Sequence, residues 1–461
     1  MSSELSTLSA VEAVRQIRNC QISAEDYANA LMAQCRNHER LNAFIQFDPE
    51  QVLQQARQAD HRQSIGKILG PIHGIPIVIK DNFDIAGYVT TAGTPGLKDH
   101  RVTRTAPVVQ SLLDAGGIIL GKTNMHEMAF GATCNNVAFG AVRNPENIGR
   151  IAGGSSGGTA AAIAAGMAPV GLGTDTAGSV RVPAALCGLV GLRPTMDSYS
   201  RSGIVPLSRT RDTAGPMARN VADLALLHTI LDGTRAPILP VKLEGLRVGI
   251  RKDYDLEVDA DVSTVVDDEL RRLQKLGVEC VDIEIDDTED IFVNVARPIT
   301  VWEAPEEIEA YLRESGANLE FRELVEQIVS PDVSLYFQAM RNSRIDLQAI
   351  YRDAINRRVP EICAKYRRYF LDNRLDVLAY PTTPMTAGFV GENQLDDIGG
   401  HEVWNGRYLL NTTPITLTGM PGLTLPIGRT AQGLPVGLEM ATQAHSDNQL
   451  LSIGLAWENS R

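Results

Sequence analysis

The chain has 461 residues, of which 44% are hydrophobic and 21% charged, so it can bury a large core and is not an intrinsically disordered chain. Its formal net charge of -13 at pH 7 provides no basic field that would attract nucleic acid or an anionic membrane surface. Partners of those two classes are therefore not expected.

The six cysteines are dispersed along the chain and form no Cys-x-x-Cys pair. They are Cys20, Cys35, Cys134, Cys187, Cys280 and Cys363. This spacing argues against a disulfide framework and against a structural zinc site. The N-terminal stretch has no basic start followed by an apolar core, and no apolar run reaches the roughly 18 residues that a membrane helix needs. We therefore expect a cytoplasmic protein that is neither secreted nor membrane-spanning.

Apolar positions at helical spacing over residues 9–60 predict that the chain opens with helices. From about residue 68, short apolar runs typical of strands alternate with helical stretches. The expected strands lie at 74–79, 117–121, 168–173 and 188–192, and the expected helices at 106–116, 159–166 and 220–233. Such alternation indicates an α/β fold, in which helices cover both faces of a buried sheet.

Residues 286–376 are charged and rich in helix-forming residues, and we interpret them as an inserted helical cap. The α/β pattern then resumes, with strands expected at 376–384, 422–428 and 434–440 and a closing helix at 446–460. Since no internal repeat or low-complexity linker interrupts the chain, one continuous domain with an insertion is preferred to two domains.

The stretch "RIAGGSSGGTAAAIAAG" at 150–166 places a Gly/Ser loop before a helix. A Walker phosphate loop is excluded because no lysine follows Gly158, and a dinucleotide fingerprint is weak because the glycines fall in pairs. The stretch does match Gly-x-Ser-x-Gly, which would make Ser155 or Ser156 the nucleophile of an α/β-hydrolase, with His445 as a partner in a loop that follows a strand. The alternative is that these small residues only let a helix pack closely on a strand.

A second cluster, "GTDTAGSVRVPAALCG" at 173–188, follows an apolar run, so its turn is expected at the carboxyl end of a strand, where ligands collect. Successive N–H groups of such a turn can converge on a developing oxyanion beside Ser179. The base could be a neutral lysine, and Lys80 and Lys122 both end apolar strands. A lysine of ordinary pKa is neutral in only about one molecule in 2,500 at pH 7, so burial would have to lower its pKa by roughly 3 units. Spacing alone does not choose between the two lysines.

The chain resembles the amidase signature family, whose members are serine amidases with a Ser-cisSer-Lys triad, over about 40–233 and again over 376–440. The resemblance is carried by successive blocks in the family's order: "GIPIVIKDNFDIAGYVTTAGT" (74–94), "GKTNMHEMAFG" (121–131), "RNPENIGRIAGGSSGG" (143–158), "GTDTAGSVRVPAALCGLVGLRPT" (173–195) and "DTAGPMARNVADLALL" (212–227). It implies the amidase-signature fold, a large mixed twisted sheet covered by helices on both faces, with a helical insertion. The single domain 1–461 would then comprise N-terminal helices (1–65), the signature core (66–235), the insertion (286–376) and a C-terminal return to the core (377–461).

The resemblance assigns the triad to Lys80, Ser155 and Ser179, and the oxyanion N–H groups to Thr176, Ala177, Gly178 and Ser179. In such a relay Lys80 takes a proton from Ser155, which takes one from the nucleophile Ser179, without a metal or organic cofactor. The family usually has glycine where this chain has Ala177, so the turn must keep φ in the ordinary range at that residue. We interpret Lys122, Arg181, Asp175 and His126 as structural.

The blocks look closest to those of arylacetamide hydrolases, such as indoleacetamide or mandelamide hydrolases, so the expected activity is cleavage of a small amide to carboxylate and ammonia. The alternatives are a glutaminase subunit of the glutamyl-tRNA amidotransferase type and a hydrolase of urea-like amides. In the family, the segment aligned with Ala129 lines the acyl site. An aryl group could be enclosed between that segment and Trp302, Tyr336 and Phe337 of the insertion, or these aromatics could form only the insertion's own core. The expected partner is a small-molecule amide, and a homodimer is the candidate assembly.

Overall fold

The computed structural model describes residues 2–234, 236–251, 258–285, 288–342, 345–391, 395–398 and 401–461. Its centre is an 11-stranded mixed sheet with the strand order β1-β3-β2-β6-β8-β7-β14-β15-β11-β9-β10. In chain order these strands are β1 (Phe44–Gln46), β2 (Pro76–Lys80), β3 (Ile118–Thr123), β6 (Val170–Asp175), β7 (Val190–Arg193), β8 (Thr213–Ala218), β9 (Arg247–Arg251), β10 (Glu279–Ile283), β11 (Val377–Pro381), β14 (Gly422–Arg429) and β15 (Pro435–Ala441). The expected mixed α/β sheet is thus confirmed.

The middle of the sheet is buried on both faces. Every residue of β2, β3, β6, β7 and β8 is buried, which explains why several of these segments are continuous apolar runs rather than alternating patterns. The strand β2 lies parallel to both β3 and β6, and β6 pairs antiparallel with β8. Parallel pairing brings the carboxyl ends of β2 and β6 to the same edge of the sheet.

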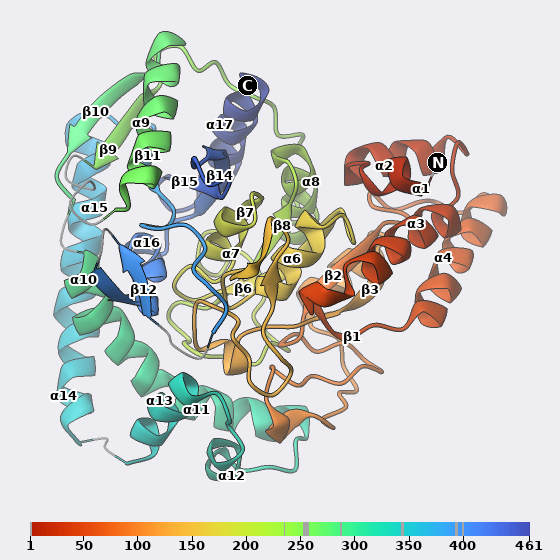
Figure 1. Cartoon of the computed structure of the whole chain (residues 1–461), viewed down its shortest axis with the longest axis horizontal. Coiled ribbons are helices and arrows are strands. Elements are labelled where there is room, and N and C mark those ends of the chain that lie inside the picture. The colour runs from red at the N-terminus through yellow and green to blue at the C-terminus, as the bar shows by residue number, and fades with distance from the viewer. Residues whose placement is uncertain are drawn as a thin grey trace.

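Helices pack around this sheet, with the N-terminal group at the right of Figure 1. They are α1 (Ser2–Ser6), α2 (Ala10–Arg18), α3 (Ala24–Asn37), α4 (Pro49–Ser64), α5 (Pro107–Asp114), α6 (Gly157–Ala164), α7 (Arg181–Leu186), α8 (Val221–Asp232), α9 (Ala260–Lys275), α16 (Thr413–Thr418) and α17 (Asp447–Asn459). Capping residues in the sequence mark the start of two of them: Ser23 and Asp26 form a capping box on α3, and Asp48 caps α4 ahead of Pro49.

The insertion is helical, as expected, and runs along the left side and the bottom of Figure 1. It contains α10 (Thr288–Ile291), α11 (Arg297–Ser315), α12 (Phe321–Glu326), α13 (Pro331–Asn342), α14 (Ile345–Asp353) and α15 (Val359–Asn373), with π-helical turns at Phe292–Ala296 and Ala354–Arg358. One apolar cluster joins α11, α12 and α13 to Ala92, Leu97, Met128 and Val205 of the core. The insertion therefore packs directly on the segments that follow β2 and β3.

Several strands of the structure were not predicted from the sequence. The three half-buried residues of β1 lie within the stretch expected to be helical, and β8 ("TAGPMA") contains a glycine and a proline that obscure it. The small hairpins β4 (Arg143–Asn144) with β5 (Asn147–Ile151), and β12 (Leu395–Ile398) with β13 (His401–Trp404), were also missed. Among the helices that the structure describes, none is long and apolar enough to cross a membrane.

Candidate active site

The three residues of the expected triad come from three neighbouring segments. Lys80 is the last residue of β2, Ser155 lies in the loop before α6, and Ser179 lies in the turn between β6 and α7. The loop and the turn are joined by the main-chain N–H of Ser156, which donates to the carbonyl oxygen of Ser179 at 3.1 Å. All three residues therefore lie at the edge where the carboxyl ends of β2 and β6 meet.

The Lys80 amine is fully buried, and both of its recorded partners are hydroxyl groups. Its Nζ lies 2.7 Å from Ser155 Oγ and 2.7 Å from Thr174 Oγ1. Burial is the main cause that lowers the pKa of Lys80 to about 7, while the nearby acidic groups Asp175 and Asp212 act in the opposite direction. A substantial fraction of the Lys80 amines is therefore neutral at neutral pH and able to accept a proton.

Thr174 was not identified from the sequence. Its Oγ1 accepts a hydrogen bond from Asn82 Nδ2 at 3.1 Å as well as the contact from Lys80, so it helps to fix the amine. The available signal was its place at the end of β6, the strand beside β2. A threonine at a strand end has many structural uses, which is why that signal did not single it out.

Lys122 has a different environment from Lys80. Its Nζ lies 2.9 Å from the Asp81 carboxylate, with both side chains fully buried, and it donates to the carbonyl oxygen of Val89 at 3.0 Å. Both recorded contacts of the Lys122 amine are thus with Asp81 and Val89, and neither is with a serine hydroxyl. Of the two candidate lysines, the geometry thus favours Lys80 as the base and leaves Lys122 a structural ion pair.

The Gly/Ser loop is packed tightly against the core. A Cβ on Gly158 would lie 2.2 Å from the carbonyl oxygen of Asn124, so no larger residue fits there. The peptide bond between Gly154 and Ser155 is cis, and the Ser155 carbonyl oxygen accepts the N–H of His126 at 3.1 Å. The loop therefore both packs closely against the segment around Asn124 and places Ser155 against Lys80.

The nucleophile-elbow alternative finds no support in the geometry. Ser155 and Ser156 are both 0% exposed, whereas an elbow nucleophile has to face the substrate. Ser156 Oγ donates to the carbonyl oxygen of Thr174 at 3.3 Å. His445 is exposed and lines neither of the two cavities at the site, so it is not placed as a partner for either serine.

The turn that carries Ser179 is built around the buried Asp175 carboxylate. That carboxylate accepts the N–H of Gly178 at 3.0 Å, and Arg181 lies 2.9 Å and Arg193 3.2 Å from it. The two arginines hold the pKa of Asp175 well below its usual range against the effect of burial. Asp175 and Arg181 thus have the structural contacts expected of them.

Two residues of the turn bear directly on the expected oxyanion donors. Ala177 is not among the described residues with positive φ, as the alanine requires, and its carbonyl oxygen accepts from Thr412 Oγ1 at 2.5 Å. Gly178 has φ of +135°, and a Cβ there would lie 2.1 Å from Thr412 Oγ1, so glycine is needed. The Gly178 N–H donates to Asp175, which helps to shape the turn, and its role as an oxyanion donor stays a prediction.

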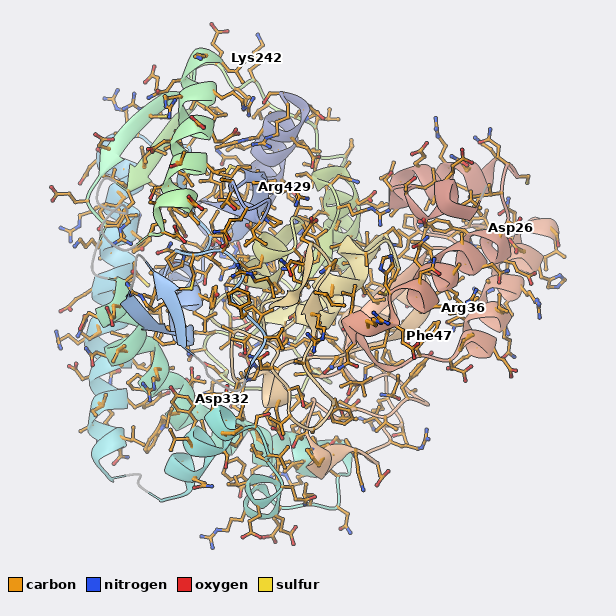
Figure 2. All side chains as sticks on the ribbon, in the orientation of Figure 1. Asp26, Arg36, Phe47, Lys242, Asp332 and Arg429 are labelled. Carbon is orange, nitrogen blue, oxygen red and sulfur yellow. The ribbon has the colours of Figure 1, made fainter. Side chains whose placement is uncertain are left out.

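His126 lies between the core and the insertion. Its Nδ1 accepts the N–H of Cys134 at 3.2 Å, which leaves Nε2 to donate to Asp332 of α13 at 3.0 Å. Asp332 is labelled in Figure 2, where α13 approaches the core. These contacts give His126 a structural link to the insertion, as expected, although it also lines the cavity beside Ser179.

Ser179 opens into a cavity of about 110 Å³ that the core and the insertion enclose together. The core supplies Thr176, Ala177, Ala129, Phe130 and Leu207, and the insertion supplies Phe292, Arg297, Thr300, Asp332 and Tyr336. A second, more polar cavity of about 530 Å³ shares Ala129, Thr176 and Leu207 with the first and reaches Asn82 and Thr174 beside the lysine.

Only one of the three insertion aromatics expected in the pocket lies there. Tyr336 lines the Ser179 cavity. Phe337 is 0% exposed and packs against Phe130 and Phe321, while Trp302 stacks on Tyr351 with ring centroids 5.4 Å apart. Phe337 therefore belongs to the insertion's own core, in line with the second of the two alternatives, and Trp302 is half-buried and does not line the Ser179 cavity.

In the described ranges, no three His, Cys, Asp or Glu side chains gather in an arrangement that could hold a metal ion.

A model of the family described as Amidase matches residues 26–451. The chain is 38% identical to an indoleacetamide hydrolase of Agrobacterium vitis, over 98% of this chain and 97% of the relative. It is 36% identical to a mandelamide hydrolase of Pseudomonas putida, over 97% and 90%. Among solved structures, the peptide amidase of Stenotrophomonas maltophilia superposes with a TM-score of 0.84 at 28% identity, covering 98% of this chain and 96% of that one.

Proposed function

Since the chain belongs to the amidase family, we propose that it hydrolyses the C–N bond of a small carboxamide, giving a carboxylate and ammonia through a serine acyl-enzyme. The observation that carries this proposal is the buried amine of Lys80, 2.7 Å from Ser155 Oγ and with its pKa lowered to about 7. Such an amine can act as a general base near neutral pH, and a serine nucleophile requires a base to accept its proton.

In the proposed reaction, neutral Lys80 accepts the proton of Ser155 while Ser155 accepts that of Ser179. Ser179 Oγ then bonds to the amide carbon, and the carbonyl electron pair moves onto oxygen. The N–H groups of Thr176, Ala177 and Ser179, for which the described residues offer no recorded acceptor, stabilise that oxyanion. The proton returns through Ser155 to the amide nitrogen, the C–N bond breaks and ammonia leaves. Water, deprotonated by the same relay, cleaves the acyl-enzyme.

We propose an arylacetamide as the substrate. The names of the relatives, an indoleacetamide hydrolase and a mandelamide hydrolase, support this choice. The cavity beside Ser179 supports it as well, because Ala129, Phe130, Leu207 and Tyr336 give it apolar and aromatic walls. Burying an aryl group removes on the order of 100 Å² of apolar surface, worth roughly 2.5 kcal/mol, or nearly a hundredfold in kcat/KM if the gain is realised in the transition state.

The test is ammonia release from phenylacetamide, indoleacetamide, acetamide and glutamine, with the Ser179→Ala variant as the blank. We expect phenylacetamide or indoleacetamide to be hydrolysed at least about tenfold more efficiently than acetamide, a conservative part of that gain. A similar advantage for acetamide would overturn the aryl assignment. An advantage for glutamine would instead favour a glutaminase subunit of the amidotransferase type.

We also propose a cytoplasmic location and assembly as a homodimer. All six cysteines are free in the structure, which suits a reducing compartment. Fractionation of the source cells tests the location. Light scattering tests the assembly, for which a mass near twice 50.0 kDa is expected.

A further inference from the structure

Two arginines line the cavity beside Ser179. Arg211 lies just before β8, and Arg297 is the first residue of α11 in the insertion. They belong to separate parts of the chain, and the expected aryl group does not by itself need either charge. Among the described lining residues the cavity also has the carboxylate of Asp332, which lies 3.0 Å from His126 Nε2.

Arg211 is buried with its hydrogen-bonding capacity only partly used. The residue is 2% exposed, and its Nη2 donates to the carbonyl oxygen of Ala296 at 2.8 Å and to Thr300 Oγ1. Its Nε and Nη1 are buried and have no hydrogen-bond partner within the described residues. Buried donors without an acceptor are costly, so a guanidinium group in this state is poised to bind one.

The surroundings offset the charge of Arg211 only in part. Burial lowers the pKa of Arg211 to about 10, although Glu303 and Asp212 act to raise it. The Glu303 carboxylate itself accepts hydrogen bonds from Ser208, Thr210 and Tyr351 and pairs with Arg209. A desolvated guanidinium that keeps free donors is matched best by a carboxylate, which can accept two parallel hydrogen bonds.

Arg297, at the start of α11 in the insertion, contributes the second positive charge. Its Cζ lies 4.5 Å from the ring centroid of Tyr336, so its guanidinium group covers the aromatic wall of the cavity. No carboxylate lies within ion-pair distance of Arg297 among the described residues. The cavity thus combines apolar walls, the nucleophile and two guanidinium groups.

From this combination we infer that the substrate carries, besides its carboxamide and its apolar or aromatic framework, a carboxylate that Arg211 and Arg297 bind. This inference rests on the proposed function and narrows its substrate class to half-amides of dicarboxylic acids. Arg211 and Arg297 are then specificity-determining residues, because they contact the part of the substrate that does not react.

The experiment compares phenylacetamides that carry a carboxymethyl group, at the meta or para position, with analogues that carry a neutral methoxymethyl group. Ammonia release gives kcat/KM for each compound with the wild-type protein and with the Arg211→Gln, Arg297→Gln and Arg209→Gln variants. Arg209 is the matched control: its substitution removes the same charge two residues from Arg211, but its side chain is 39% exposed, pairs with Glu303, Glu306 and Glu307, and lines the other cavity.

We expect the better carboxylate isomer to exceed its neutral analogue at least about tenfold in the wild-type protein. The ratio should fall toward one in Arg297→Gln and in Arg211→Gln and stay unchanged in Arg209→Gln. Equal rates for both compounds in the wild-type protein would overturn the inference, as would equal loss of the ratio in all three variants. In either case hydrolysis of phenylacetamide would leave the proposed function intact.

Binding gives a readout that does not depend on turnover. Calorimetry with Ser179→Ala should show the dicarboxylate product binding at least about tenfold more tightly than phenylacetate, and Arg297→Gln should remove the difference. If no amide is hydrolysed, the proposed function fails while this titration still decides the carboxylate site. Equal affinities for the two acids would overturn that site.

Discussion

Replacing Lys80 by methionine should abolish activity and yet stabilise the protein at low pH. Burial lowers the pKa of Lys80 from 10.5 to about 7. The difference, about 3.5 units at 1.36 kcal/mol each, corresponds to a penalty on the order of 5 kcal/mol for holding the charged amine in the folded state. The hydrogen bonds to Ser155 and Thr174, lost in the variant, are worth about 1 kcal/mol each, which leaves a net gain of roughly 3 kcal/mol.

The sign of the pH dependence follows from proton binding. Between pH 7 and 10.5 the unfolded chain holds a proton on Lys80 that the folded protein does not, so wild-type stability rises with pH across that window. The penalty is fully present below about pH 7. The advantage of Lys80→Met should therefore be largest at pH 6 and shrink by about 1.4 kcal/mol per pH unit above pH 7.

Urea unfolding followed by circular dichroism at pH 6, 8 and 10 measures this difference, and ammonia release measures activity. We expect Lys80→Met to lose several orders of magnitude in kcat and to unfold at higher urea than the wild-type protein at pH 6. Wild-type kcat/KM should rise as Lys80 loses its proton, chiefly between about pH 6 and 8, somewhat below the range of about 7 to 9 that an amine of only modestly lowered pKa would give. A variant less stable than the wild type at pH 6, or a flat pH profile, would refute the reasoning.

Other variants separate structure from catalysis. Lys122→Met should lose about 3–5 kcal/mol of unfolding free energy, because it leaves the buried Asp81 carboxylate without its ion pair, while kcat of the folded protein changes little. Urea unfolding measures the loss of stability, and steady-state kinetics measures kcat. A loss of kcat as large as that of Lys80→Met would contradict the structural role of Lys122. Phe337→Ala should cost about 3–5 kcal/mol and leave the ratio of kcat/KM for phenylacetamide to that for acetamide unchanged. Tyr336→Ala should lower that ratio several-fold, and the opposite pattern in this pair would place Phe337 in the pocket.

Where the sequence predicted the fold correctly, it did so through long apolar runs. Fully buried parallel strands such as β2 and β3 need such runs, so their positions were clear. The strand β8 is just as buried, but Gly215 and Pro216 interrupt its pattern, and only its pairing with β6 and β7 specifies it. Tertiary contacts, which no local pattern reports, decided that element.

The candidate site shows the same division. Lys80, Ser155 and Ser179 stood out because they occupy family blocks, and the structure brings the first two into contact, while their catalytic roles stay predictions. The spacing of the sequence could not choose between Lys80 and Lys122, since the choice depends on a carboxylate that approaches only one of them. Arg211 and Arg297 were missed because they line one cavity only through the packing of the insertion against the core, which no local pattern reports.

The central claim is that Ser179 is the nucleophile of a serine amidase. The most direct measurement is to treat the protein with a fluorophosphonate, digest it and map the adduct by mass spectrometry, since an activated serine attacks phosphorus as it does an acyl carbon. The account predicts the added mass on the peptide that contains Ser179, and little labelling in Lys80→Met. An adduct on Ser155 or Ser156, with Ser179 unmodified, would contradict it.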